Sequence, residues 1–556
     1  MKGSKTFLGI KHLLCAGVIL LGLSMGSCSN DNLQVTPPKP EENIPTTIAE
    51  CVSADIVTLR AIAKANPQAN LFEGDKPKEW KGVELEWVKN KDGKYSVSVF
   101  RIKEETKLTD FVLRLEGKGE ADVLAHLKTI DIVSAALKEV KIFAQPDLKK
   151  VRINGIGKSK VESLDIQGGK ALKNVSIEAM PALTAIMLGG DEMESVTLDN
   201  LPAFKEQSNL KFRIKNEEEK TEDTVLKSLI LKGDLKMLDG LYLSGLGLEE
   251  LIIEASLPAM TSLSLNRNKL KGTFELKGLE KLQTLYLGNN NISTLKVSAC
   301  PELTELDASG NATLTVADLN LPGLKTLDLN ETGLTALDMS SFASIKKVSA
   351  YSSKLVSVTL SAQNSKLSQL NLSENLIEKI DFPQEVKSIF LLTLNKNELK
   401  SLDLTHMTSL ERALLNDNKL ESLVVSPNEK DVESFEHLEC KNNHLSAKIL
   451  RGIPQTLTEL SKMEAAPQSL LGRVDAEKKQ INAVEERDEL MLSVIIQKHD
   501  GKDWVDAPAE DFSEKGGIYT FSDTGKYRAI CADIGLYWKF DTFGKKNPYI
   551  IGEIGL

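Results

Sequence analysis

The sequence is poor in aromatic residues and in histidine, and this shortage excludes several kinds of site. Phe, Trp and Tyr make up 5% of the 556 residues, and six residues are histidine. Neither the HExxH spacing of a zinc protease nor the GxSxG turn of a serine hydrolase occurs. We therefore predict no catalytic site, no cofactor and no metal site.

The sequence also has fewer basic residues than acidic ones. Acidic residues outnumber basic ones by 79 to 69, which gives a formal net charge of −10. Binding to DNA or RNA depends on clustered lysines and arginines that displace counterions from phosphates, and no basic stripe is present. We expect no nucleic-acid partner.

Long apolar runs are absent except for one near the start. Leu13–Leu23 is mostly apolar, follows three lysines and precedes Ser24–Cys28. A helix needs about 20 apolar residues to cross a bilayer. This segment is therefore predicted to be a secretory signal and not a spanning helix.

The residues that follow predict a lipid anchor. Ser24–Cys28 resembles the bacterial lipobox, in which the cysteine becomes the lipidated first residue, although Met25 replaces the usual leucine. An ordinary signal peptide with a free Cys28 is the alternative. Ser29–Asn32 resembles a weak form of the acidic signal that sends some lipoproteins to the outside of the outer membrane, and Thr36–Pro45 is a proline-rich tether. We expect an outer-membrane lipoprotein exposed at the cell surface.

What the sequence has in abundance is an internal repeat. Leu282–Ile292 reads LxxLxLxxNxI, and the phrase returns at a nearly constant interval, with one longer step at the end. Its fourth position is occupied by Leu241, Leu263, Leu285, Leu306, Leu327, Val348, Leu370, Leu392, Ala413 and Leu438. This interval is typical of a leucine-rich-repeat solenoid, in which stacked coils bury each other's leucines. Alternation in each short strand sends leucines inward and the residues between them outward.

A recurring asparagine follows each strand. Its positions are Asn268, Asn290, Asn311, Asn375, Asn397, Asn418 and Asn443. An amide there can satisfy backbone groups that would cost about 1 to 3 kcal/mol each if buried unpaired. Thr332 and Ser353 interrupt the series, so these two coils are expected to be weaker. Glycosylation or ligand contact is the alternative role for these asparagines.

Apolar triplets upstream return at half this period. Val140–Ile142 and Val151–Ile153 begin the series, which predicts extended structure on both sides of each coil. Leu229 and Leu241 are separated by only half a period, and we interpret this as a slip of register. The charged run Asn216–Glu222 just before is predicted to be a loop.

The cysteines show no pattern of a metal site or a disulfide framework. Cys51, Cys300, Cys440 and Cys531 are widely separated and lack CxxC spacing. Cys440 occupies a leucine position of the repeat, and Cys300 lies in a coil turn. We expect small buried residues, and a disulfide from Cys51 stays open as an alternative.

Non-repeating segments flank the array. Ile48–Ala65 is predicted to be a helix, followed by strand material at Tyr95–Val99. Trp80 and Trp87 are expected to pack in this cap, with a ligand platform as the alternative. Near the other end, Asp523–Ala529 has the D-x-G-x-Y spacing of the tyrosine corner in immunoglobulin-like sandwiches.

Together these features resemble bacterial surface leucine-rich-repeat proteins of the internalin-like type, in which a cap, a repeat array and an Ig-like module are joined. The resemblance covers most of the mature chain and implies that the concave repeat face binds a protein of a host or neighbouring cell. The predicted parts are a signal peptide (1–27), a lipidated cysteine with its tether (28–46), an N-terminal cap (47–130), the β-rich repeat solenoid (131–455) and a small C-terminal Ig-like β module (460–556).

The outward strand positions supply candidate ligand contacts. They are Tyr242, Tyr286, Asp307, Asp328, Asn330, Tyr351, Arg412, His437, Glu439 and Lys441. A solvated polar face is the alternative reading of the same residues. A glycan-binding surface lipoprotein is the alternative function, but sugar sites favour aromatic platforms, and all four tryptophans lie outside the array.

Overall fold

The computed structural model describes residues 44–113, 124–143, 145–167, 171–205, 210–215, 221–223, 225–426, 435–453, 463–532, 534 and 548–556. The predicted signal peptide, Cys28 and most of the tether lie outside these residues. Residues Pro45–Leu556 form one compact unit. Among the described residues, no helix is both long and apolar enough to cross a membrane.

The predicted helix Ile48–Ala65 is shorter in the structure, because a separate 3-10 turn covers Ile48–Glu50 and Cys51 forms a bridge with Tyr95. Helix α1 (Ser53–Ala65) buries Ile56, Leu59 and Ile62. It ends at Asn66, whose buried side chain accepts hydrogen bonds from the backbone N–H groups of residues 109 and 110 and donates one to the carbonyl of residue 62. The side chain of the asparagine therefore joins the helix to the first coils.

Both tryptophans of this region pack against other aromatic rings. Trp80 and Trp87 are each 8% exposed, and their ring centroids lie 6.3 Å apart. Trp80 also meets Phe72 edge-on, with 5.1 Å between the ring centroids. The packing interpretation is confirmed, because neither ring presents a free face.

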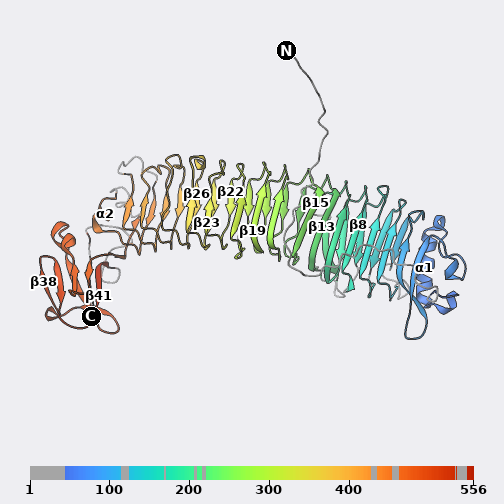
Figure 1. Cartoon of the computed structure of the whole chain (residues 1–556), viewed down its shortest axis with the longest axis horizontal. Coiled ribbons are helices and arrows are strands. Elements are labelled where there is room, and N and C mark those ends of the chain that lie inside the picture. Colours follow the sequence, from blue (N-terminus) through green and yellow to red (C-terminus); the bar gives the residue numbers. More distant parts are fainter. Residues whose placement is uncertain are drawn as a thin grey trace, which may run out of the picture. The chain divides into compact units, whose positions relative to one another are not determined.

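Two sheets line opposite sides of the first coils, and their strands alternate along the chain (Figure 1). The eight-stranded sheet contains β1 (Val83–Lys89), β2 (Tyr95–Ile102), β4 (Thr129–Val133), β6 (Lys150–Asn154), β8 (Asn174–Glu178), β10 (Glu192–Asp199), β13 (Val225–Asp234) and β15 (Glu250–Ser256). The six-stranded sheet contains β3 (Asp110–Leu113), β5 (Glu139–Phe143), β7 (Ser163–Gln167), β9 (Ala185–Gly189), β11 (Leu210–Lys215) and β12 (Thr221–Asp223). The half-period triplets thus form strands on both sides of each coil, as predicted.

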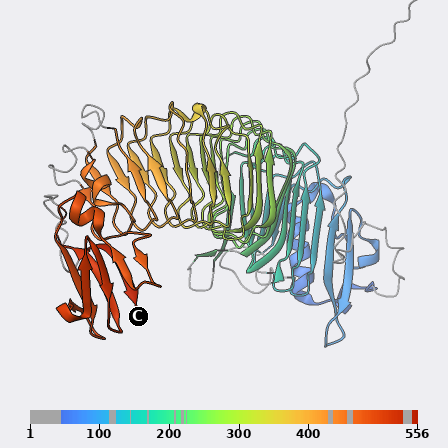
Figure 2. The same cartoon turned by 60° about the vertical axis from the view of Figure 1, so that its left-hand side comes forward.

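Later coils continue the same plan with shorter strands (Figure 2). An eleven-stranded sheet contains β14 (Gly240–Tyr242), β16 (Ser262–Ser264), β18 (Thr284–Tyr286), β20 (Glu305–Asp307), β22 (Thr326–Asp328), β24 (Lys347–Ser349), β26 (Gln369–Asn371), β27 (Leu391–Thr393), β29 (Arg412–Leu414), β31 (His437–Glu439) and β32 (Met463–Glu464). The other side carries β17 (Lys271–Lys277), β19 (Asn291–Ser298) and β21 (Val316–Leu319), then the pairs β23 (Ala336–Asp338) with β25 (Ser357–Thr359) and β28 (Ser401–Asp403) with β30 (Ser422–Val424).

The predicted register slip is wrong. Leu229 pairs with Leu251 in the eight-stranded sheet, and Leu241 pairs with Leu263 in the eleven-stranded sheet. Both pairs have the same separation along the chain, so the coil period is intact on both sides. The short interval from Leu229 to Leu241 joins opposite sides of one coil. Of the charged run just before, residues 216–220 lie outside the described residues, and Thr221–Asp223 forms β12 instead of a loop.

The C-terminal residues form two further sheets. One contains β33 (Gln468–Ser469), β41 (Tyr549–Gly555), β40 (Lys526–Cys531), β36 (Val494–His499) and β37 (Trp504–Asp506), and the other contains β34 (Val474–Asp475), β35 (Gln480–Asn482), β39 (Ile518–Phe521) and β38 (Phe512–Lys515). The Tyr527 hydroxyl donates to Asp511 Oδ2 at 3.0 Å. A tyrosine corner would direct this hydroxyl to a backbone group, so the hydrogen bond differs from the predicted motif.

Side-chain hydrogen bonds attach this β region to the last coil. Helix α2 (Ala447–Arg451) follows β31, and Ser446 caps its first turn. The backbone N–H of Ala447 donates to the Tyr549 hydroxyl at 2.8 Å, and Arg451 Nε donates to the carbonyl of Ile534 at 2.8 Å. Two hydrogen bonds therefore join the end of the solenoid to the β region.

The four described cysteines form no disulfide with one another, and all are buried. Cys440 is 0% exposed and Cys300 is 3% exposed, which matches their expected place in the coil core. Burial raises the pKa of Cys51 to about 11 and that of Cys531 to about 12. Both thiols are therefore protonated at neutral pH, and neither is a ready nucleophile.

Candidate functional site

In most strands of the eleven-stranded sheet the middle of three residues is buried and the two flanking residues are half-buried or exposed, although Gly240 and Ser264 are buried. The middle residue of each triplet enters the core, as Leu285 does at 0% exposure, and the flanking residues Thr284 and Tyr286 are half-buried. We call the surface formed by the outward residues of the strands of the eleven-stranded sheet, together with the second residue after each of these strands, the outer face. All ten candidate contacts lie on this face.

The inward turn after each strand is built on the seven recurring asparagines, which we call the asparagine ladder. All seven asparagines are at most 8% exposed. Asn290 is representative: its Nδ2 donates to the carbonyls of Leu265 and Leu287, at 3.0 and 2.9 Å, and its Oδ1 accepts from the N–H of Leu270 at 3.0 Å. Each side chain thus links consecutive coils.

Hydroxyl groups replace the amide in two coils. Thr332 Oγ1 and Ser353 Oγ both donate to the carbonyl of Leu329, each at 3.0 Å. The N–H of Thr332 donates to Ser353 Oγ at 3.2 Å. A hydroxyl has one proton to donate where an amide has two, so these coils contain fewer side-chain links.

A second asparagine series was missed in the sequence. Asn266, Asn395 and Asn416 stand two positions before ladder asparagines, in the pattern N-x-N. Each Oδ1 accepts the backbone N–H of the next coil, at 2.7 to 2.8 Å. Asn330 does the same for Tyr351 at 2.7 Å, and it also accepts from a serine hydroxyl. Its amide oxygen is therefore engaged within the protein.

Three of the candidate contacts on the outer face are tyrosines. Tyr242 on β14 is 40% exposed, and Tyr286 on β18 is half-buried. Burial, and then hydrogen bonding to Glu305, raise the pKa of Tyr286. Hydrogen bonding to Glu374 raises the pKa of Tyr351. The hydroxyls of Tyr286 and Tyr351 stay protonated at neutral pH and can serve as hydrogen-bond groups to a ligand.

Carboxylates gather next to Tyr286. Asp307 and Asp328 are direct neighbours in the register of β20 and β22, and Glu305 lies on the same face of β20. The N–H groups of Ser309 and Asn330 each donate to the aspartate two positions earlier, at 2.9 and 3.0 Å. Burial, with repulsion from Asp307, raises the pKa of Asp328. We call Glu305, Asp307 and Asp328 the acidic stripe.

The other end of the outer face mixes charges of both signs. Arg412 on β29 is exposed and pairs in register with His437 on β31. His437 Nε2 lies 2.7 Å from Glu439 Oε1, and Lys441 forms an ion pair with Glu464. Burial opposes ionisation of Glu439, but hydrogen bonds from His437 and Asn416 hold its pKa below the ordinary value.

Three of these side chains carry ligand atoms that suit a divalent cation. The donor atoms of His437, Glu439 and Glu464 all lie within 4.8 Å of one another. Imidazole and carboxylate are common metal ligands. The sequence offered no spacing signal for this group, because Glu464 arrives one full coil after Glu439. The Lys441 ammonium already pairs with Glu464, so one of the two carboxylates is engaged within the protein.

No protein-family model matches the chain. Tsukushi of Xenopus tropicalis is 34% identical over 119 residues, which is 19% of this chain and 34% of Tsukushi. The chain thus spans about a third of the length of this relative.

Solved structures of leucine-rich-repeat proteins are similar at low identity. InlJ of Listeria monocytogenes is 18% identical, with a TM-score of 0.42, and the match covers 73% of this chain and 83% of InlJ. YopM of Yersinia enterocolitica is 20% identical, with a TM-score of 0.34, and the match covers 67% and 79%. The regular coils, the buried leucines and the asparagine ladder of this chain show that it is a leucine-rich-repeat solenoid.

Proposed function

We propose that the protein binds another protein through the outer face of the eleven-stranded sheet. The observation that carries this proposal is that the inward and outward residues of the coils have different roles. Leucines and ladder asparagines point inward and hold the coils together, whereas Tyr242, Tyr286 and Arg412 occupy outward positions of their strands. Side chains at such positions can differ without disturbing the core of the coils, so they are available to contact a ligand.

The acidic stripe indicates what kind of surface would fit. Neighbouring carboxylates of the same sign repel each other, and a partner with lysines or arginines would relieve that repulsion. Charge complementarity of this kind raises association rates and selects among partners. Tyr286 lies beside the stripe and is the proposed aromatic anchor, because tyrosine is enriched among the residues that dominate interface energies.

Capture experiments with matched variants test this proposal. The immobilised protein is exposed to surface extracts of host cells and of neighbouring bacteria. A partner should be retained by the wild type and by Val316→Ala, whose side chain is 50% exposed on the other side of the coils. Tyr286→Ala should weaken its binding at least tenfold, as expected for an aromatic anchor. Equal capture by both variants would contradict the proposal.

The glycan alternative needs an exposed aromatic platform. Trp80 and Trp87 are packed in the N-terminal region, and Trp538 lies outside the described residues. Trp504 is half-buried, and the Arg528 guanidinium lies 4.4 Å from its ring centroid. One face of that ring is therefore already covered, which supports a protein ligand over a sugar.

A lipid anchor on Cys28 is part of the same proposal, because it would hold the outer face away from the membrane on a proline-rich tether. Cys28→Ala should release the mature protein from the membrane fraction into the soluble fraction, since no acyl chain can then be attached. Protease treatment of intact cells should digest the wild-type protein. Full protection from the protease would indicate an inward-facing lipoprotein.

A further inference from the structure

The strand ladder on one side of the solenoid is interrupted between two consecutive coils. β15 is the last strand of the eight-stranded sheet and β17 is the first of the next sheet, and no strand pairing joins them although every residue of both is described. On the opposite side of these coils, β14, β16 and β18 pair without a break. The coils are therefore closed on the outer face and open on the other side.

One extra residue coincides with the break. Leu229 pairs with Leu251 on one side of it, and Phe274 pairs with Leu295 on the other. The corresponding step from Leu251 to Phe274 is longer than either of these two steps, by a single residue relative to the first. The pairing of β17 is irregular beside Gly272, whose φ is +72°. This irregularity lies in the pairing of β17 with β19, where Ser293 of β19 is skipped in the register, and the pairing continues beyond it.

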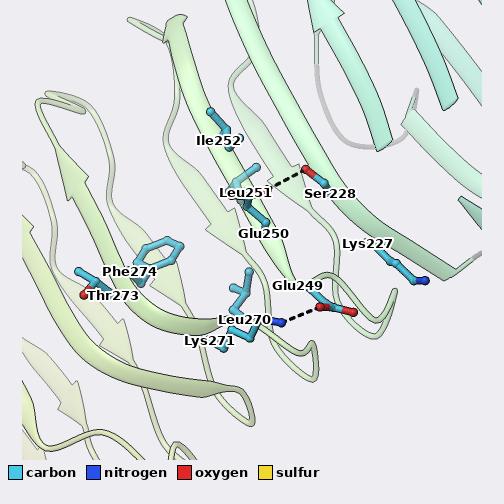
Figure 3. A pocket seen from close by; sticks show the side chains of 10 residues that line it. All are labelled: Lys227, Ser228, Glu249, Glu250, Leu251, Ile252, Leu270, Lys271, Thr273 and Phe274. Carbon is cyan, nitrogen blue, oxygen red and sulfur yellow. Dashed lines mark hydrogen bonds and ion pairs between the residues drawn. The ribbon is translucent and has the colours of Figure 1, made fainter. Parts of the chain in front are cut away.

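The opening between β15 and β17 contains two cavities, with volumes of about 470 and 530 Å³. Figure 3 shows the first, with Leu251 and Ile252 of β15 on one wall and Phe274 of β17 on the other. Leu251 and Phe274 are half-buried, whereas their pairing partners Leu229 and Leu295 are 0% exposed. Apolar side chains that face the core elsewhere are thus left partly uncovered here. We call this opening the β15–β17 groove.

Charged residues lie at both ends of the groove, and Glu250 and Glu275 also line the two cavities. Lys271 Nζ forms an ion pair with Glu249 Oε2 at 2.9 Å at one end (Figure 3), and Lys277 and Glu280 lie at the other. The side chains of β15 and β17 that continue the core rows between these ends are apolar. A ligand that complements this distribution has an apolar middle.

Backbone groups narrow the choice of ligand further. A strand edge presents unpaired N–H and C=O groups, which another extended backbone can satisfy. Here two such edges belong to consecutive coils, and each strand is seven residues long. A lipid or a small molecule would cover the apolar wall but would leave both edges unpaired.

We propose that the β15–β17 groove binds an extended segment of a partner polypeptide, which adds one strand between the two edges. Such a segment has about seven residues, with apolar side chains at alternate positions that enter the core. This site lies on the side of the coils opposite to the outer face and is independent of the function proposed for that face.

A synthetic peptide provides the test. The probe is a fluorescein-labelled copy of Asn291–Ser298, the segment that already pairs with β17 on its other edge. In fluorescence anisotropy, the full mature chain should bind it saturably and at least tenfold more tightly than a shuffled peptide without alternation. Ala255→Glu places a charge in the groove wall and should abolish binding, whereas Val316→Glu, at an exposed site on β21, should not. Equal affinity for both peptides, or binding that survives Ala255→Glu, overturns the proposal.

Hydrogen exchange locates the bound peptide. Backbone amides of β15 and β17 should exchange faster than those of β13 and β19 in the free protein, and they should slow when the probe is added. Protection of β18 and β20 instead would place the peptide on the outer face and overturn the groove proposal. A chain that begins at residue 44 should bind as the mature chain does. If only this shorter chain binds, the occupant is the protein's own N-terminal segment and not a partner.

Discussion

Replacement of Asn290 by alanine is expected to lower the free energy of unfolding by about 4 kcal/mol, because several buried backbone groups lose their partners at a cost of about 1 to 3 kcal/mol each. The amide serves the carbonyls of Leu265 and Leu287 and the N–H of Leu270. Solvent has little access to this turn, since Asn290 is 4% exposed. Urea denaturation followed by circular dichroism measures the change.

Two further variants decide whether the ladder is the cause. Asn320 is exposed in a loop of the same array, and Asn320→Ala should change the unfolding free energy by less than about 0.5 kcal/mol. Thr332→Asn restores an amide where the ladder is broken and should stabilise the protein. A loss for Asn290→Ala no larger than that for Asn320→Ala would show that the ladder hydrogen bonds contribute little.

Arg473→Ala is expected to destabilise the C-terminal β region by about 3 kcal/mol at pH 8, because removal of one partner leaves a buried charge unpaired. Arg473 pairs with Glu485 and, at 3.3 Å, with Glu486, whose side chain is 0% exposed. Glu486 also lies 3.4 Å from the Tyr549 hydroxyl, which itself accepts from Ala447 of the last coil. The ion pair therefore supports the junction between solenoid and β region.

The stability lost on Arg473→Ala should depend on pH, and the direction of that dependence follows from Glu486. Burial raises the pKa of Glu486 in the folded protein, so at pH values between the unfolded-state and folded-state pKa the folded state holds a proton that the unfolded state releases. Stability from this group is present at low pH and is lost as pH rises through the folded-state pKa. Arg473→Ala removes the neighbouring positive charge, so its effect should grow from pH 5 to pH 8 in thermal denaturation.

Control variants separate burial from charge. Lys478→Ala removes an exposed ion pair with Asp475 in the same region and should leave the melting temperature unchanged. Adding Glu486→Gln to Arg473→Ala removes the unpaired carboxylate and should recover part of the stability at pH 8. If Lys478→Ala and Arg473→Ala have equal effects, the burial of Glu486 is not what makes Arg473 important.

Local patterns allowed most of the coil structure to be predicted. Alternation around Leu285 placed leucines inside and Tyr286 outside, because side chains of successive strand residues point to opposite faces. The half-period triplets predicted strands on both sides. The same reasoning failed between Leu229 and Leu241, because residues on opposite sides of one coil were compared as if they shared a sheet.

Contacts that depend on coil length were not predictable from spacing alone. Glu464 approaches Glu439 only because the intervening coil returns the chain to the same row of the sheet. Asn330 was expected to be free for a ligand, and its Oδ1 accepts hydrogen bonds from Ser349 and Tyr351 in the next coil. One-dimensional spacing does not reveal which atoms of an outward side chain are already engaged.

The sequence by itself determined the solenoid, its period, its inward leucines and the position of its asparagine ladder, because each of these follows from local alternation repeated at a constant interval. Only the tertiary structure decided where the coils separate. The single extra residue before Phe274 is a small change in the sequence, and it coincides with the missing pairing of β15 with β17 and with the two cavities between them. Whether neighbouring strands meet depends on how whole coils stack, and that is a property of distant residues packed together.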